Sequence, residues 1–270
     1  LIVGEHHCAL FEVGISAVID QVIKQLNGLG ITLDYIIPSH PHSDHITGLP
    51  GLAAQYPKAQ IIVANGAQEF IKHPKAASLM FKEDKFMAKN LVLFDIMPGR
   101  PPLEKIPDLN DSIAIDKQKT LDLGGIVLDL VKVSGHSPGN LIGLINSKKI
   151  LFSSDSMGFH YPGRGYFPLF FTGVDPYLAT MDFIREYNPL ILCPAHQGPL
   201  SGQAAMEGIL ESYDIAINTI NMIKQSDLGD KTLADQLFEQ GYKDEFTLYT
   251  PENIQNCCTL LIKRSKEAKH

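Results

Sequence analysis

Short apolar runs, each closed by polar or turn-forming residues, recur along the first 200 residues of the chain. Ile, Val and Leu dominate these runs, as they do in buried strands. We expect strands over residues 34–38, 60–64, 126–133, 141–145, 149–152 and 190–193, with the fourth and fifth joined as a hairpin. The N-terminus is also apolar and lacks a basic region, so we expect the chain to start within a first strand and not with a signal peptide.

Apolar positions at helical spacing lie between these runs. They predict helices over residues 17–26, 46–55, 67–89 and 175–186. Ser16 is a candidate N-cap for the first helix, Pro50 weakens the second, and Pro74 breaks the third. The segment from Pro98 to Ile113 holds four prolines and is expected to be a loop.

After residue 200 the pattern becomes mostly helical, with predicted helices over residues 203–224, 232–240 and 251–266. The earlier alternation of strands and helices predicts an α/β class. We therefore expect an α/β domain over residues 1–200, with a helical insertion at about residues 66–120. A helical C-terminal extension over residues 201–270 is expected to pack on this domain.

Composition narrows the class of protein further. The 270 residues are 44% hydrophobic and 20% charged, which is ordinary for a globular chain with its own core. A net charge of −7 argues against a nucleic-acid-binding surface. No apolar run reaches the length of a transmembrane helix, so no membrane association is expected. The four cysteines do not form the dense framework of secreted scaffolds, and we expect a cytoplasmic location.

The strongest chemical signal is the hexapeptide His40-Pro41-His42-Ser43-Asp44-His45, the pattern HxHxDH. It follows a predicted strand, where a turn lets His40 and His42 point to one side and hold one ion. Asp44 and His45 lie further on and can face a second ion. Imidazole and carboxylate together suit Zn, Fe or Mn. The hexapeptide therefore predicts a metal site.

Three more residues follow predicted strands directly, namely His136, Asp155 and His196. Each is therefore expected at the lip of a sheet, where ligands from separate strands can converge. Read singly, each is an ordinary loop residue. Because they occur together after the hexapeptide, we interpret them as the remaining metal ligands.

With these seven positions the sequence resembles the metallo-β-lactamase-fold hydrolase superfamily, and in particular its dinuclear glyoxalase II-like and lactonase-like members. The resemblance runs from the first strands to about residue 200. It implies an αββα four-layer sandwich, with two mixed β-sheets inside and helices outside. It also implies two divalent metal ions, with Zn favoured and Fe or Mn as alternatives. The implied ligands are His40, His42 and His136 for metal one, Asp44, His45 and His196 for metal two, and Asp155 as the bridge.

The sequence departs from this family in two places. True β-lactamases usually place a Cys in the second site, where Asp155 is expected here, so antibiotic hydrolysis is not expected. The family often shows an Asp-x-Gly turn after an early strand, whereas this chain has Glu12-Val13-Gly14. Glu12 bears on a supporting contact and not on the ligands themselves.

The resemblance and the metal chemistry predict an enzyme in which a metal-bridging hydroxide attacks an ester, thioester or lactone carbonyl. Asp44 is the candidate catalytic residue, which would orient the hydroxide and shuttle its proton. An aromatic-rich segment after Asp155 holds the candidate substrate-binding residues Tyr161, Tyr166 and His160, which could line an apolar pocket and donate to an oxyanion. Packing of this segment on the core is the alternative interpretation.

Three other functions stay open. A phosphodiesterase or nuclease of the same fold would need a basic groove, against which the net charge argues. A diiron redox enzyme or sensor would keep the same ligands, but related flavodiiron proteins usually carry Glu where this chain has His42. A signalling protein could retain the metals without catalysis. The expected partner is a small-molecule substrate, and a homodimer is one open alternative for the oligomeric state. The C-terminal helices match, by position only, the substrate-binding helices of glyoxalase II-like thioesterases.

Overall fold

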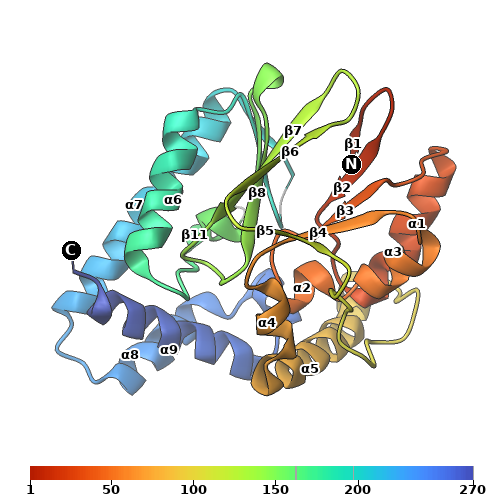
Figure 1. Cartoon of the computed structure of the whole chain (residues 1–270). Coiled ribbons are helices and arrows are strands. Elements are labelled where there is room, and N and C mark those ends of the chain that lie inside the picture. Colours follow the sequence, from red (N-terminus) through yellow and green to blue (C-terminus); the bar gives the residue numbers. More distant parts are fainter. Residues whose placement is uncertain (162, 197, 270) are drawn as a thin grey trace. The chain divides into compact units, whose positions relative to one another are not determined.

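The computed structural model describes residues 1–161, 163–196 and 198–269 (Figure 1). The chain divides into two units. Unit 1 comprises Leu1–Lys132, Gly139–Leu141 and Leu248–Thr250. Unit 2 comprises Val133–Pro138, Ile142–Thr247 and Pro251–His270.

Unit 1 contains a mixed five-stranded sheet in the order β1-β2-β3-β4-β5. Its strands are β1 (Ile2–Val3), β2 (Cys8–Phe11), β3 (Tyr35–Ile37), β4 (Gln60–Ala64) and β5 (Ile113–Ile115). β1 is antiparallel to β2, and the other neighbours are parallel. The strands predicted over residues 34–38 and 60–64 are confirmed as β3 and β4, and Ile36, Ile37, Ile62 and Val63 are buried. The N-terminal run forms two short strands instead of one.

An antiparallel hairpin follows, formed by β6 (Gln118–Asp122) and β7 (Val127–Val133). The strand predicted over residues 126–133 is thus confirmed. β6 was not expected from the sequence, since Leu121 is its one apolar and buried residue. The predicted helical insertion is correspondingly shorter than residues 66–120: its helices end at Phe94, and β5 and β6 follow.

The helices of unit 1 correct two sequence expectations. They are α1 (Ile19–Gly28), α2 (Ser43–Ile46), α3 (Leu49–Gln55), α4 (Ala67–Lys72) and α5 (Pro74–Asn90), with 3-10 turns η1 (Ser16–Val18) and η2 (Leu91–Phe94). The helix predicted over residues 46–55 is wrong as one element, because Pro50 favours the first turn of a new helix, α3. Ser16 does not cap α1; its hydroxyl donates to Asp84 instead. The predicted break at Pro74 is confirmed.

The core of unit 1 lies between the sheet and helices α1 and α3 (Figure 1). Ile36 of β3, Ile19 of α1 and Leu52 of α3 are fully buried within it. Burying such side chains contributes about 1.5–3 kcal/mol each. This core fixes the end of β3, where the hexapeptide begins.

The strands β8 (Asn140–Ile145), β9 (Ile150–Ser154), β12 (Ile191–Pro194) and β13 (Leu200–Ser201) follow. β8 is antiparallel to β9, β9 is parallel to β12, and β12 is antiparallel to β13. Their sheet is therefore mixed, as predicted, and the hairpin turns over η3 (Asn146–Lys148). A separate two-stranded hairpin, β10 (Phe159–Tyr161) with β11 (Gly165–Phe167), forms where the sequence indicated an aromatic-rich segment.

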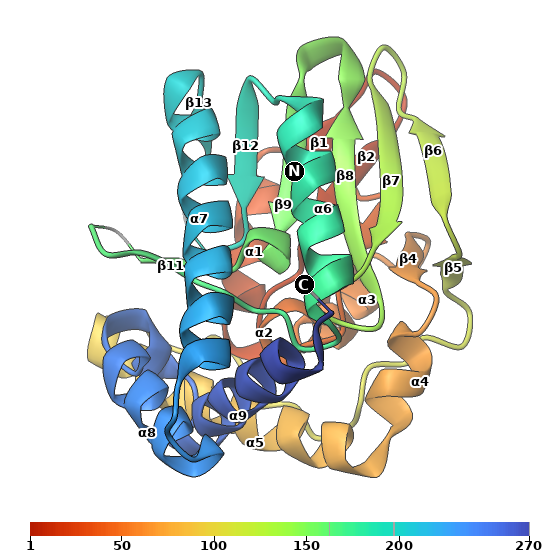
Figure 2. The same cartoon turned by 90° about the vertical axis from the view of Figure 1, so that its left-hand side faces the viewer.

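Helices α6 (Val174–Tyr187) and α7 (Gln203–Gln225) lie side by side over one face of the unit 2 strands (Figure 2). They are followed by α8 (Asp230–Gly241), η5 (Asp244–Leu248) and α9 (Pro251–Glu267). α8 and α9 pack on each other, and α7 packs on α6 and β11. The helical C-terminal region is thus confirmed, while a domain boundary at residue 200 stays a prediction. None of the helices in the described part of the chain combines the length and apolar character needed to cross a membrane.

Candidate metal centre

Each predicted metal-ligand segment lies just after the carboxyl end of a strand. The hexapeptide follows β3, and His136 follows β7. Asp155 comes directly after β9, and His196 lies two residues beyond β12. The sequence prediction that every candidate sits at the end of a strand is confirmed.

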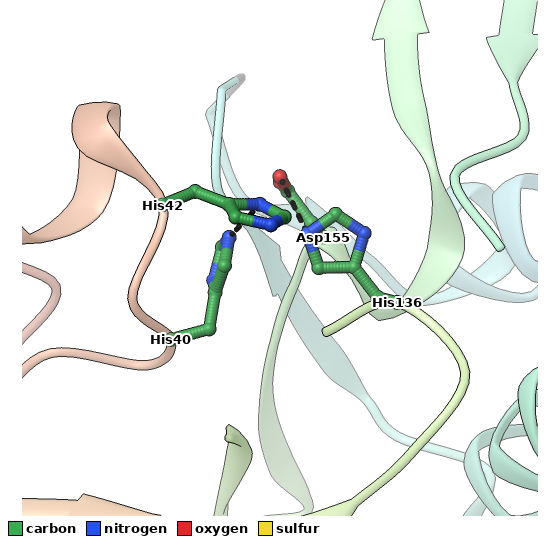
Figure 3. A group of neighbouring side chains, drawn as sticks. All are labelled: His40, His42, His136 and Asp155. Carbon is green, nitrogen blue, oxygen red and sulfur yellow. Dashed lines mark hydrogen bonds and ion pairs between the residues drawn. The ribbon is translucent and has the colours of Figure 1, made fainter. Parts of the chain in front are cut away.

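In unit 1 the hexapeptide leaves β3 as a turn and then enters a short helix. His42 stands immediately before α2, in extended conformation, and α2 carries Asp44 and His45. The rings of His40 and His45 lie 4.0 Å apart between centroids, and both side chains are buried. Nε2 of His40 lies 3.1 Å from Nδ1 of His42 (Figure 3). Three imidazoles therefore gather at one point of unit 1.

Glu12 makes the supporting contact that the sequence had left open. It follows β2 with a left-handed backbone, at a φ of 75°. Its Oε2 lies 3.0 Å from Nδ1 of His45. Glu12, His40 and His45 each offer a ligand atom, and these atoms all lie within 4.8 Å of one another. A glutamate at this turn thus reaches a histidine of the hexapeptide.

Asp44 has two neighbours at the same carboxylate oxygen. Its Oδ2 lies 3.1 Å from Nε2 of His45 and accepts a hydrogen bond of 2.7 Å from the hydroxyl of Tyr249. Sequence reasoning missed Tyr249, because no local motif marks a residue 205 positions away from its partner. Its position could be found only from the folded chain.

In unit 2, Asp155 lies between two histidines. Its Oδ2 is 3.5 Å from Nε2 of His136, a contact drawn in Figure 3. Its Oδ1 is 3.2 Å from Nε2 of His196. The residue before it, Ser154, has φ 48° and ψ −138°, a strained conformation of the kind that clusters at functional sites. The two oxygens of Asp155 thus face different imidazoles.

Hydrogen bonds to the far ring nitrogens decide which atoms can bind a metal. Nδ1 of His136 lies 2.9 Å from the carbonyl oxygen of Leu169. A carbonyl can only accept, so Nδ1 carries the hydrogen and Nε2 of the neutral ring presents a lone pair to Asp155. His45 repeats this pattern, with Nδ1 on Glu12 and Nε2 toward Asp44.

At His136 and at His45, a ring nitrogen thus faces a carboxylate oxygen. A nitrogen lone pair and a carboxylate oxygen repel each other unless a proton or a cation lies between them. A nitrogen and oxygen donor set of this kind fits borderline divalent metals. The chain therefore carries histidine and carboxylate side chains grouped in a way that is suited to metal binding. The residues present fit the metals that the sequence predicts.

The structure favours a packing role for the three predicted substrate-binding residues. The hydroxyl of Tyr161 donates to the carbonyl of Gly241 at 2.8 Å, and burial raises the pKa of Tyr161 well above its ordinary value. Burial, reinforced by Glu211, raises the pKa of Tyr166 to about 12. The ring of His160 packs on that of Tyr166, with centroids 4.7 Å apart. Their contact with a substrate stays a prediction.

The model of the family described as "Metallo-beta-lactamase superfamily" matches residues 1–196 of the chain. The metallo-beta-lactamase fold-containing protein ST1585 of Sulfurisphaera tokodaii is 28% identical over 191 residues, which are 69% of this chain and 70% of that protein. Hydroxyacylglutathione hydrolase of Synechococcus sp. strain WH7803 is 38% identical over 68 residues, which are 24% of this chain and 27% of the relative.

Solved structures share the fold of this chain. The crystal structure of ST1585 from Sulfolobus tokodaii has a TM-score of 0.63 at 21% identity, covering 94% of this chain and 91% of the other. The structure of the metallo-beta-lactamase family protein TTHA1429 from Thermus thermophilus has a TM-score of 0.64 at 17% identity, covering 99% and 88%. The predicted class, an α/β sandwich of mixed sheets and helices with a helical C-terminal region, is confirmed.

Proposed function

The chain belongs to the metallo-β-lactamase superfamily, and on that premise we propose that it is a hydrolase with two divalent metal ions that cleaves an ester, thioester or lactone. Most members of this superfamily are hydrolases, which supports an enzymatic role. The observation that carries the proposal is Asp155, whose two oxygens face His136 and His196. One carboxylate between two imidazoles suits a bridge between two ions.

The proposal assigns the ligands as the family resemblance implies. Metal one would be held by His40, His42 and His136, and metal two by Asp44, His45 and His196, with Asp155 shared. All seven positions fall within the residues that match the family model. Zinc is the proposed metal, with iron and manganese as alternatives that the same ligands accept.

Two bound ions would lower the pKa of a shared water and polarise the carbonyl of the substrate. The side chains of the protein provide the remaining functions. The carbonyl of Leu169 and the carboxylate of Glu12 fix the tautomers of His136 and His45. Asp44 is the proposed proton acceptor from the attacking water, and its Oδ2 accepts a hydrogen bond from the Tyr249 hydroxyl. The same carboxyl would return that proton to the leaving group.

The choice of a carbonyl substrate has two supports. The short match to a hydroxyacylglutathione hydrolase favours a thioester or a related acyl compound. The net charge of −7 is unfavourable for a nucleic-acid or other polyanionic substrate. A small neutral or weakly charged acyl compound is therefore the proposed substrate class.

Metal analysis combined with a substrate panel tests the proposal. Protein purified without chelators should hold two divalent ions per chain and should hydrolyse members of a panel of lactones, thioesters and esters. Turnover of phosphodiesters alone would overturn the carbonyl assignment. One ion per chain at saturating metal would overturn the dinuclear assignment.

Asp44→Asn tests the proposed proton acceptor. We expect the variant to stay folded and its kcat to fall by about 10²–10⁴-fold, the usual contribution of a general base. Metal content is measured in parallel, because Asp44 is also a proposed ligand. Asp214→Asn, on the exposed surface of α7, is the matched control. Near-normal turnover of Asp44→Asn with both metals bound would exclude the assigned role.

A further inference from the structure

Tyr249 lies outside the residues that match the family model, yet its hydroxyl donates to Asp44 Oδ2 at 2.7 Å. We propose that Tyr249 is a positioning residue of the metal centre, which holds the Asp44 carboxylate in its metal-binding orientation. This inference rests on the proposed function, since it takes Asp44 as a ligand and proton acceptor. It assigns part of the site to the C-terminal region of the chain.

The hydrogen bond from Tyr249 acts on the Asp44 oxygen that also faces His45. Oδ2 of Asp44 faces Nε2 of His45 at 3.1 Å, and the Nδ1 hydrogen of His45 is directed to Glu12. A hydrogen bond from a hydroxyl to a carboxylate is charge-assisted and directional. The Tyr249 hydroxyl therefore fixes the direction of the same oxygen that faces His45. Loss of this hydrogen bond would favour rotation of the Asp44 side chain away from His45.

Residues 248–250, here named the tyrosine strap, are anchored on both sides of Tyr249. The backbone N–H of Thr250 donates to Glu83 at 2.9 Å, and the Thr250 hydroxyl donates to the other oxygen of the same carboxylate. Glu83 is only 1% exposed. Leu248 and the ring of Tyr249 pack on an apolar cluster of unit 1 formed by Ile15, Ala17, Met87, Ala88 and Leu91. The hydroxyl of Tyr249 is therefore held in place.

Glu83 lies in helix α5, and the next residue of that helix stabilises the segment that carries Asp44. Asp84, which follows Glu83 in α5, is fully buried and accepts a hydrogen bond from the Thr47 hydroxyl. Thr47 directly follows α2, the helix that carries Asp44. Two adjacent carboxylates of α5 thus fix the strap and the end of α2. The contact between Tyr249 and Asp44 is built from both sides.

A purely structural link would behave differently from a positioning residue. It would change the free energy of unfolding and leave the affinity and the electronic environment of the metals unchanged. The discriminating measurements are therefore metal affinity and the visible absorption of bound Co²⁺, which responds to the geometry of its ligands. Neither measurement depends on knowing the natural substrate.

The test uses the full chain with Tyr249→Phe, which removes one hydroxyl and keeps the ring. Zn²⁺ affinity is measured by competition with a chelator, and Co²⁺ is titrated spectroscopically. We expect one of the two ions to bind about 10–100-fold more weakly, as for other residues that orient a metal ligand, and the Co²⁺ spectrum to change. Tyr213→Phe on α7 removes a hydroxyl outside the site and is the matched control.

Wild-type affinity for both ions and an unchanged Co²⁺ spectrum in Tyr249→Phe would overturn the inference. Failure of the wild-type chain to bind Co²⁺ would overturn it together with the proposed function. Normal metal binding by the wild type without hydrolysis of any carbonyl substrate would remove only the proposed function, and the effect of Tyr249→Phe on affinity would still decide the inference.

A second variant tests whether the strap acts through Tyr249. Thr250→Val removes the hydroxyl that donates to Glu83 and should weaken the same metal ion, while Thr250→Ser should restore its affinity. In the Tyr249→Phe background, Thr250→Val should cause no further loss of affinity, because its effect passes through the missing hydroxyl. Additive losses in the double variant would contradict this pathway.

Discussion

Single hydrogen bonds determine what the histidines of this chain can do. The Leu169 carbonyl is hydrogen-bonded to Nδ1 of His136, and the Glu12 carboxylate is hydrogen-bonded to Nδ1 of His45. The near nitrogens, Nε2 in both rings, face Asp155 and Asp44 and are the ring atoms that a metal would bind. Such outer contacts raise the basicity of the ligand and fix its ring orientation. They are as much a part of the candidate centre as the ligands.

Glu12→Gln should weaken metal binding about tenfold or more, because the amide still accepts from His45 but lacks the charge of the carboxylate. Chelator competition with Zn²⁺ measures the affinity. Glu69→Gln, at an exposed position of α4, serves as the control. An unchanged affinity in Glu12→Gln would show that the carboxylate does not support His45.

Tyr161→Phe separates packing from substrate binding. Loss of the hydrogen bond to Gly241 should lower the free energy of unfolding by about 1 kcal/mol and leave kcat/KM for the preferred carbonyl substrate unchanged. Urea denaturation and steady-state kinetics measure the two quantities. A fall in kcat of tenfold or more at unchanged stability would instead support the substrate-binding role predicted from the sequence.

At the scale of elements, local pattern predicts most strands and helices and fails for identifiable reasons. β4 was predicted with its observed bounds, since a run of Ile and Val is bounded by turn residues. β6 was missed, because Leu121 is its only buried position. The sequence indicates Pro50 as a weak point within one helix, whereas Pro50 lies in the first turn of a separate helix, α3. Partnerships between distant elements leave no local pattern at all, and Tyr249 was missed for that reason.

Helix α5 connects the early loops of unit 1 through one carboxylate. Asp84 accepts four hydrogen bonds, from the backbone and hydroxyl of Ser16, the hydroxyl of Thr47 and the backbone N–H of Leu103. Three separate segments thus depend on a single buried side chain.

Asp84→Asn should therefore lower the free energy of unfolding by about 2–3 kcal/mol, since an amide cannot accept from all four donors and brings its own hydrogens into a buried site. Urea denaturation gives the change. Asp227→Asn, on an exposed loop, should leave the free energy of unfolding within about 0.5 kcal/mol of wild type. Equal stability of the two variants would show that Asp84 does not hold these segments.

At the scale of the whole molecule, candidate ligand positions could be selected from the sequence, whereas the substrate could not be inferred. Five histidines and two aspartates could be selected because each follows an apolar strand that the sequence makes visible. A substrate pocket is formed by side chains whose neighbours depend on the complete fold. The aromatic residues near Asp155 show this limit, since Tyr161 directs its hydroxyl to the backbone of α8.

The proposed ligands come from segments spread over residues 40–196, so metal binding should stabilise the folded chain. Ions that bind the folded state stabilise it by about 4 kcal/mol when present at 1,000 times their Kd. For a protein of this size that corresponds to a Tm difference of roughly 8–16 °C. We therefore expect removal of the metals by a chelator to lower Tm by this amount, and added Zn²⁺ to restore it.

Calorimetry of metal-loaded, chelated and reconstituted protein measures this difference. The double variant His42→Ala with His196→Ala removes one proposed ligand from each site and is the control for direct effects of the chelator. Its Tm should lie near that of the chelated wild type and should respond little to chelator or to Zn²⁺. If the wild type loses both metals without any change in Tm, the ions do not couple to folding, and the histidine and carboxylate clusters must be stable without them.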